Sequence, residues 1–63
     1  MKFKLEVGLN DAGMQLDCGS LDRPALCEVL ENCEIAIMMD LEKGNLKDSN
    51  GNTIGKWEII EDV

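Results

Sequence analysis

The chain has 63 residues, with 13 acidic and 6 basic side chains, no histidine and a formal net charge of −7. A chain of this length forms one domain, residues 1–63, and buries only about 60% of the surface that its unfolded state exposes. The charge argues against direct binding to a nucleic-acid backbone, and it favours a basic protein surface as partner, although acidity also serves solubility.

The first predicted element is a strand over residues 2–9. Apolar side chains alternate with polar ones there, which indicates a strand with one buried face formed by Phe3, Leu5, Val7 and Leu9. Residues 10–13 then predict a turn. Residues 14–18 alternate again and can form an extra short N-terminal strand, but Gly19, Ser20 and Asp22 interrupt the pattern and favour a loose connection.

The segment from Arg23 to Lys43 predicts one long helix of about six turns. Pro24 suits the first turn, where its missing N–H removes no hydrogen bond, and Asp22 or Ser20 can cap the free amides. Lys43 in the last turn followed by Gly44 is typical of a helix end. A spacing of 3.6 residues places one apolar arc toward the core: Leu26, Val29, Leu30, Cys33, Ala36, Ile37 and Leu41.

The opposite side of this helix is acidic but carries apolar side chains as well. We predict that it is a partner-binding surface consisting of Glu28, Glu31, Glu34, Ile35, Met38, Met39 and Glu42. Burial of Ile35, Met38 and Met39 in a partner would stabilise a complex by about 1.5–3 kcal/mol each, and methionine adapts its shape to a facing surface. The alternative is that the sheet or the N-terminal segment folds over these three residues and covers them.

The C-terminal third predicts a β-hairpin. Residues 45–48 and 53–61 flank a polar loop, and the Asn50-Gly51 pair at its centre is typical of a two-residue hairpin turn. That turn would place Leu46 opposite Gly55, on the face that Trp57 and Ile59 present to the helix.

The order of elements predicts an α+β fold of the β-α-β-β type. One long helix would pack across a three-stranded antiparallel or mixed sheet in the order 1-3-2, because the last strand is the most apolar and belongs in the centre.

Three stretches resemble a group of small uncharacterised phage and prophage proteins: the start Met1-Lys-Phe-Lys-Leu-Glu, the helical Leu26-Cys-Glu-Val-Leu30, and the tail from Leu46 to Ile59. That group ends in a hairpin of the form Leu-x-Asp-x-Asn-Gly-Asn-x-Val/Ile-Gly. The tail matches over about a quarter of the chain, and the rest matches in general form. The resemblance implies a phage-related origin and a helix followed by a hairpin, and it supplies no catalytic residues.

The residues that could form a metal or catalytic site are better explained by structural roles. Asp48, Asn50 and Asn52 alternate like calcium-loop ligands, but Thr53 and Ile59 occupy the positions that need glycine and glutamate, so turn formation explains them better. The three cysteines lack zinc spacing, and we expect reduced thiols, two of them in the core. Without histidine no nucleophile–base pair stands out, and the Glu28–Glu31 pair fits a solvated helix face. We therefore predict no catalytic, cofactor-binding or metal-binding residues.

The function that this pattern favours is that of a non-enzymatic phage-type accessory protein acting by protein–protein binding. Its partner would be a host or phage protein with a basic surface, and it can act as an acidic inhibitor of a host nucleic-acid-binding defence or replication factor. The alternative is a self-associating structural or assembly protein, a homodimer without inhibitory role. Reduced cysteines and the lack of a long apolar segment predict a cytoplasmic location and no membrane contact. The resemblance to phage proteins implies that this cytoplasm is that of a bacterial host cell.

Overall fold

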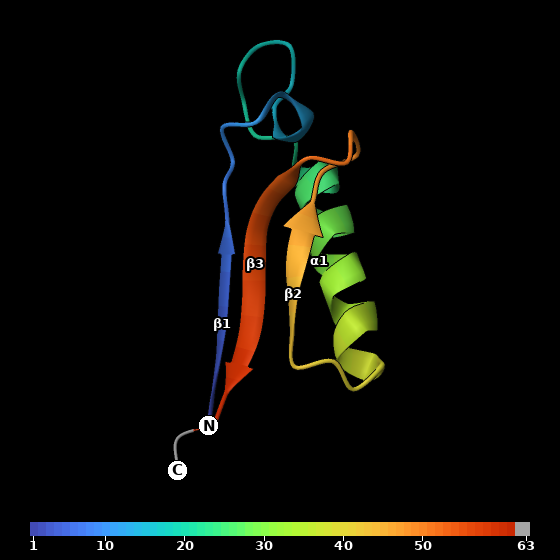
Figure 1. The fold of residues 1–63 in the computed structure, drawn as a ribbon. Coiled ribbons are helices and arrows are strands. Elements are labelled where there is room, and N and C mark those ends of the chain that lie inside the picture. Colours follow the sequence, from blue (N-terminus) through green and yellow to red (C-terminus); the bar gives the residue numbers. More distant parts are fainter. Residues whose placement is uncertain (62–63) are drawn as a thin grey trace.

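The structure is a computed structural model that describes residues 1–61. It confirms the α+β fold, with the elements β1 (Lys2–Val7), η1 (Ala12–Met14), α1 (Arg23–Met38), β2 (Lys43–Lys47) and β3 (Thr53–Ile60) (Figure 1). The extra N-terminal strand does not form. Instead η1 is a single 3₁₀ turn, and Gln15 makes an isolated bridge to Leu21.

The three strands form one antiparallel sheet in the predicted order, β1-β3-β2. Leu46 pairs with Gly55 across the β2–β3 ladder, as predicted, and Leu5 pairs with Trp57 across the β1–β3 ladder. Directly paired residues point to the same face of an antiparallel sheet, so these side chains share the face that α1 covers. The apolar strand β3 is central because it gains a partner on each side.

The hairpin loop has three residues, 49–51, rather than the predicted two-residue turn. The Gly51 N–H donates to the Asp48 carbonyl at 3.1 Å, and the Asp48 N–H donates to the Asn52 carbonyl at 3.0 Å. Gly51 has a φ of 83° and is therefore in the left-handed conformation. A residue in this conformation follows the type I turn in three-residue hairpin loops. A bulge between Leu46 and Lys47 absorbs the extra residue, which is why the expected pairing survives.

Helix α1 begins as predicted and ends five residues early. The Asp22 carboxylate accepts the Ala25 N–H at 3.2 Å, and Pro24 lies in the first turn. The helix ends at Met38, not Lys43, because Asp40 has a φ of 64°. The Asp40 N–H donates to the Ile37 carbonyl at 3.1 Å, and the Leu41 N–H donates to the Ala36 carbonyl at 3.3 Å. These two hydrogen bonds form a Schellman motif.

Gly44, predicted to end the helix, lies in β2 and serves a different purpose. A Cβ atom at this position would come within 2.8 Å of Trp57 Nε1, so the absence of a side chain leaves room for the indole ring beside the strand. The core that forms here consists of Met14, Val29, Cys33, Leu46 and Trp57. Met14 reaches it from η1 and is fully buried, a role that the alternation of residues 14–18 did not indicate.

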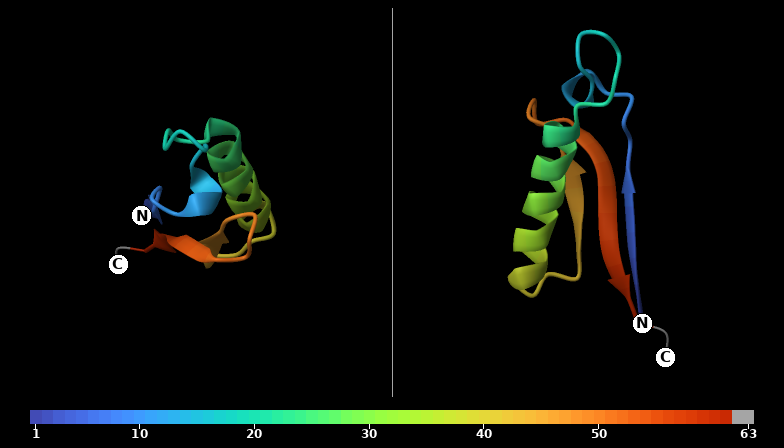
Figure 2. Two further views of the ribbon diagram at one scale, coloured as in Figure 1. Left: turned by 90° about the horizontal axis from the view of Figure 1, so that it is seen from above. Right: turned by 180° about the vertical axis from the view of Figure 1, so that it is seen from behind.

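The molecule is elongated, with extents of 45 × 19 × 17 Å, and α1 covers the sheet only in part. The helix lies against the β2 side, while β1 lies beyond β3, and η1 with its loop extends past the end of the helix (Figure 2). A sheet of three strands spaced about 4.8 Å apart, with its side chains, is wider than one helix, whose diameter is about 10 Å. A single helix therefore leaves part of the sheet open.

The predicted buried face of the first strand is wrong for the same reason. Phe3 is 50% exposed and Leu5 37% exposed, and Val7 is the half-buried member of the row. Leu9 lies past the end of β1 and is also exposed. Of the apolar arc expected in the core, Val29 and Cys33 are buried, whereas Leu30 on the helix and Leu41 beyond its end are exposed.

Candidate functional site

The second half of α1 presents three large apolar side chains to solvent. Ile35 is 58% exposed, Met38 80% and Met39 70%. We call these three residues the helix patch. The alternative that the chain's own sheet or N-terminal segment covers them is wrong, because all three are exposed. η1 lies at the other end of α1, and β1 is separated from α1 by the other two strands (Figure 1). The helix patch is thus an uncovered apolar surface at the C-terminal end of α1.

The position of the helix patch follows from the helical period. Val29 and Cys33 define the direction of the core, and Met38 lies about 140–180° away from them at 100° per residue. Ile35 falls beside Met38 on that outward side, and Met39 extends the surface as the C-cap residue. The helix is therefore apolar on both sides for its last turn, which a soluble helix rarely is without a partner.

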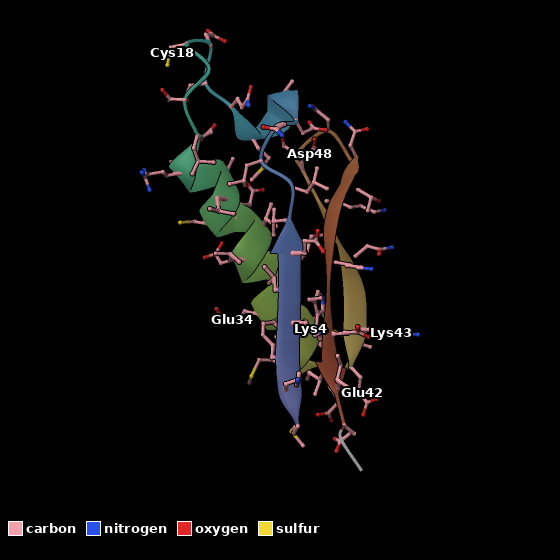
Figure 3. The ribbon with its side chains drawn as sticks, turned by 90° about the vertical axis from the view of Figure 1, so that its left-hand side faces the viewer. Lys4, Cys18, Glu34, Glu42, Lys43 and Asp48 are labelled. Atoms are coloured by element: carbon pink, nitrogen blue, oxygen red, sulfur yellow. The ribbon has the colours of Figure 1, made fainter. Side chains whose placement is uncertain are left out.

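Three of the predicted acidic residues lie with the helix patch. Glu28, Glu31 and Glu34 are exposed on α1, and Glu34 points away from the sheet in Figure 3. Each comes earlier in the helix than the apolar residues, so the surface changes from acidic to apolar along the helix axis. That arrangement gives a partner both a charged and an apolar contact.

Glu42 does not belong to this surface. Because α1 ends at Met38, Glu42 precedes β2, where its carbonyl accepts the Ile59 N–H at 2.7 Å. In Figure 3 its side chain lies beside the sheet, apart from Glu34 on the helix. The prediction placed it on the helix by extending the helical period past the Asp40 stop, so this member of the set is corrected.

The sheet collects most of the basic residues, although they are scattered in the sequence. The three strands hold five lysines, Lys2, Lys4, Lys43, Lys47 and Lys56, against two glutamates, Glu6 and Glu58. Lys43 points away from the helix in Figure 3, on the side opposite Glu34. The acidity of the chain therefore lies on α1 and the loops, and the sheet is locally basic.

Asp48 is a buried charged residue at the hairpin loop, 7% exposed. Its Oδ1 accepts the backbone N–H of Asn52 at 2.9 Å and of Asn50 at 3.0 Å. A hydrogen bond with the Asp11 side chain, followed by those from Asn52 and Asn50, lowers the pKa of Asp48 from its usual value, while burial opposes the shift. The loop's own amides occupy the carboxylate, which agrees with a turn-forming role.

The three cysteines are free thiols in different surroundings. Cys33 is buried in the core, and burial raises the pKa of its thiol. Cys18 and Cys27 are exposed, so the expectation of two core cysteines holds for one. Hydrogen bonds from the Ser20 side chain and backbone lower the pKa of Cys18. Within residues 1–61, no three His, Cys, Asp or Glu side chains are grouped so as to hold a metal ion.

Comparison with known proteins gives no relative for this surface: no family model, no curated protein and no solved structure matches the chain. The resemblance of the tail to small phage proteins stays a prediction. No helix among the described residues has the length and apolar character needed to cross a membrane. The function must therefore be argued from the geometry of the chain itself.

Proposed function

We propose that this chain is a non-enzymatic, phage-type accessory protein that acts by binding another protein through the helix patch. The observation that carries the proposal is the exposure of Ile35, Met38 and Met39, between 58% and 80%, at the end of a helix. Exposed apolar groups that lie together on a rigid element are typical of protein–protein contacts.

The partner has a basic surface with an apolar centre. Glu28, Glu31 and Glu34 precede the helix patch along α1 and would attract lysine or arginine side chains, while Met38 and Met39 fill the apolar centre. A surface of this kind on a nucleic-acid-binding protein is the one that its nucleic acid occupies. The chain would then inhibit a host defence or replication factor in the bacterial cytoplasm by competing for that surface.

The test uses the full chain as bait in host lysate at low salt, followed by purification of the captured protein. Binding of the purified partner is then compared for the wild type, Met38→Lys and Leu16→Lys. Leu16 is a matched control, because it is 49% exposed on the loop before α1 and the substitution makes the same charge change. We expect Met38→Lys to raise the Kd at least about tenfold, since burial of a methionine contributes about 1.5–3 kcal/mol.

Two further measurements examine the charge and the inhibition. Binding should weaken as salt is raised, because the charged contacts lie at the rim and are screened. Added wild-type chain should displace nucleic acid from the purified partner, and Met38→Lys should not. A partner that binds Met38→Lys as tightly as the wild type would contradict the proposed surface.

A further inference from the structure

The outer edge of β1 is open. β1 pairs with β3 on one side, and no other strand within residues 1–61 pairs with it on the other. The Gly8 N–H points to β3 and donates to the Ile54 carbonyl at 2.7 Å. The direction of the backbone N–H and C=O groups alternates along an antiparallel strand. The backbone groups of Lys2, Lys4 and Glu6 therefore also point to β3. The N–H and C=O groups of Phe3, Leu5 and Val7 therefore point to the open edge.

We propose that a second copy of this chain pairs with that edge, β1 against β1 in antiparallel orientation, about a two-fold axis that passes Leu5. The contact would join the two sheets into one of six strands. It uses a surface distinct from the helix patch, so it goes beyond the proposed function.

The charges of β1 fit this register. With Leu5 opposite Leu5 of the partner copy, each Lys4 lies opposite Glu6 of the partner copy, and Lys2 lies opposite Gly8. In its own sheet Lys4 pairs with Glu58, which pairs with Lys43 on the other side. The Leu5 register continues this row as Lys43, Glu58, Lys4, Glu6 and Lys56, so that charges of opposite sign alternate across both copies.

The neighbouring registers lack this match. A shift by one residue would place the apolar face of one copy beside the charged face of the other. A shift by two residues, centred on Lys4, puts the two Lys4 side chains opposite each other, and one centred on Glu6 does the same for the glutamates. Like charges directly opposite each other destabilise a sheet. The Leu5 register is the one of these three that opposes no like charges.

The inner face of β1 gains cover from the same contact. Leu5 is 37% exposed and would acquire Leu5 of the partner copy as its neighbour, while Phe3, 50% exposed, would lie opposite the partner's Val7. The two-fold axis is perpendicular to the sheet, so both α1 helices lie on one side of the dimer. The two helix patches would then face the same side, where a partner with two binding surfaces could contact both.

A charge exchange tests the contact. Lys4→Glu and Glu6→Lys each place like charges opposite each other at two points of the dimer, and each should raise the dimer Kd at least about tenfold in sedimentation equilibrium. In an equal mixture of the two variants, every residue 4 of one variant meets an opposite charge at residue 6 of the other. We expect the mixture to form heterodimers with a Kd within about threefold of the wild type.

The mixture also distinguishes charge repulsion between the two copies from charge repulsion within one copy. Both variants place like charges opposite Glu58 or Lys56 in their own sheet, and mixing cannot relieve that cost. Circular dichroism shows whether each variant is folded, and native mass spectrometry with one isotope-labelled variant counts the heterodimers.

Several outcomes would overturn the proposal. One is a wild type that stays monomeric at about 1 mM. Others are single variants that dimerise like the wild type, and a dimer that is split by Met39→Lys but not by Lys4→Glu, which would place the contact on the helix patch. Heterodimers that form from Lys2→Glu with Glu6→Lys, and not from Lys4→Glu with Glu6→Lys, would overturn the Leu5 register.

Discussion

Leu46 and Trp57 are each 2% exposed beneath α1, whereas Phe3 and Leu5 lie on the same face of the same sheet and are 50% and 37% exposed. All four are apolar residues in strands that alternate inward and outward. The two halves of the sheet differ in their position relative to one helix, which covers β2 and much of β3 and stops short of β1 (Figure 2). An alternating pattern thus specifies which way a side chain points, while the number of covering elements determines whether it is buried.

The largest expected effect comes from breaking the covered half. Trp57→Ala removes the largest side chain of the core and should lower the free energy of unfolding by about 3–5 kcal/mol, enough to unfold a domain of this size. Phe3→Ala removes a ring whose centroid is 6.1 Å from that of Trp57, but half of it already faces water. Its cost should be about 1–2 kcal/mol in urea denaturation. Equal costs for the two would contradict the distinction between the halves.

A second change probes how the open half is held. A Cβ atom at Gly55 would collide with the Glu6 carbonyl oxygen and lie 2.9 Å from Val7 Cα, so Gly55→Ala should push β1 away from β3. We expect a loss of about 2–3 kcal/mol and faster amide exchange in β1 than in β2. The matched control is Gly8→Ala, whose Cβ would lie 3.3 Å from the Ile54 carbonyl and should cost less than about 1 kcal/mol. Similar losses for both would mean that β1 is not held by this close approach.

Asp48 stabilises the hairpin end of the covered half in a pH-dependent way. Hydrogen bonding to the Asp11 side chain and the Asn52 and Asn50 amides lowers the pKa of Asp48 in the folded chain. A lowered pKa gives stability that is complete above the unfolded value of about 3.9 and is lost as the pH falls through the folded value. Asp48→Asn should therefore be less stable than the wild type at neutral pH, with a difference that shrinks below about pH 4.

Thermal denaturation at a series of pH values measures this difference. Asp17→Asn on the exposed loop serves as the control for the loss of one carboxylate from the chain. A difference between Asp48→Asn and the wild type that stayed constant from neutral to acid pH would show that the charge of Asp48 does not contribute.

The smallest expected effect concerns the residue that limits the length of α1. Asp40 has a φ of 64°, a conformation that costs a residue with a Cβ atom about 1–2 kcal/mol and costs glycine little. Asp40→Gly also removes a negative charge from the C-terminal end of the helix, where the helix dipole disfavours it. After the greater entropy of unfolded glycine is subtracted, we expect a gain of about 0.5–1 kcal/mol in urea denaturation. Asp40→Ala should be less stable than Asp40→Gly, and the opposite order would contradict a left-handed helix end.

The two ends of α1 differ in how well they could be predicted from the sequence. Asp22 and Pro24 predicted the start of α1 correctly, because a cap depends on a few neighbouring residues. The predicted end of α1 was wrong for two reasons. Asp40 adopts the left-handed conformation, which aspartate tolerates but does not indicate as glycine does. Gly44, taken as the helix end, is instead required by its close approach to Trp57. Glu42 left the predicted surface as a result, while Glu28, Glu31, Glu34 and the helix patch remained on the exposed side of one helix.

The one helix, the three strands and their order followed from the amino-acid pattern, as did the side toward which most side chains point, because period, caps and the hairpin signal are local properties of the chain. The tertiary structure alone decided which apolar residues are covered. It buried Met14 through η1, left Phe3 and Leu5 open beside a single helix, and gathered five separated lysines on the sheet. Burial and charge clustering depend on which segments meet in space, and a pattern along the chain does not contain that information.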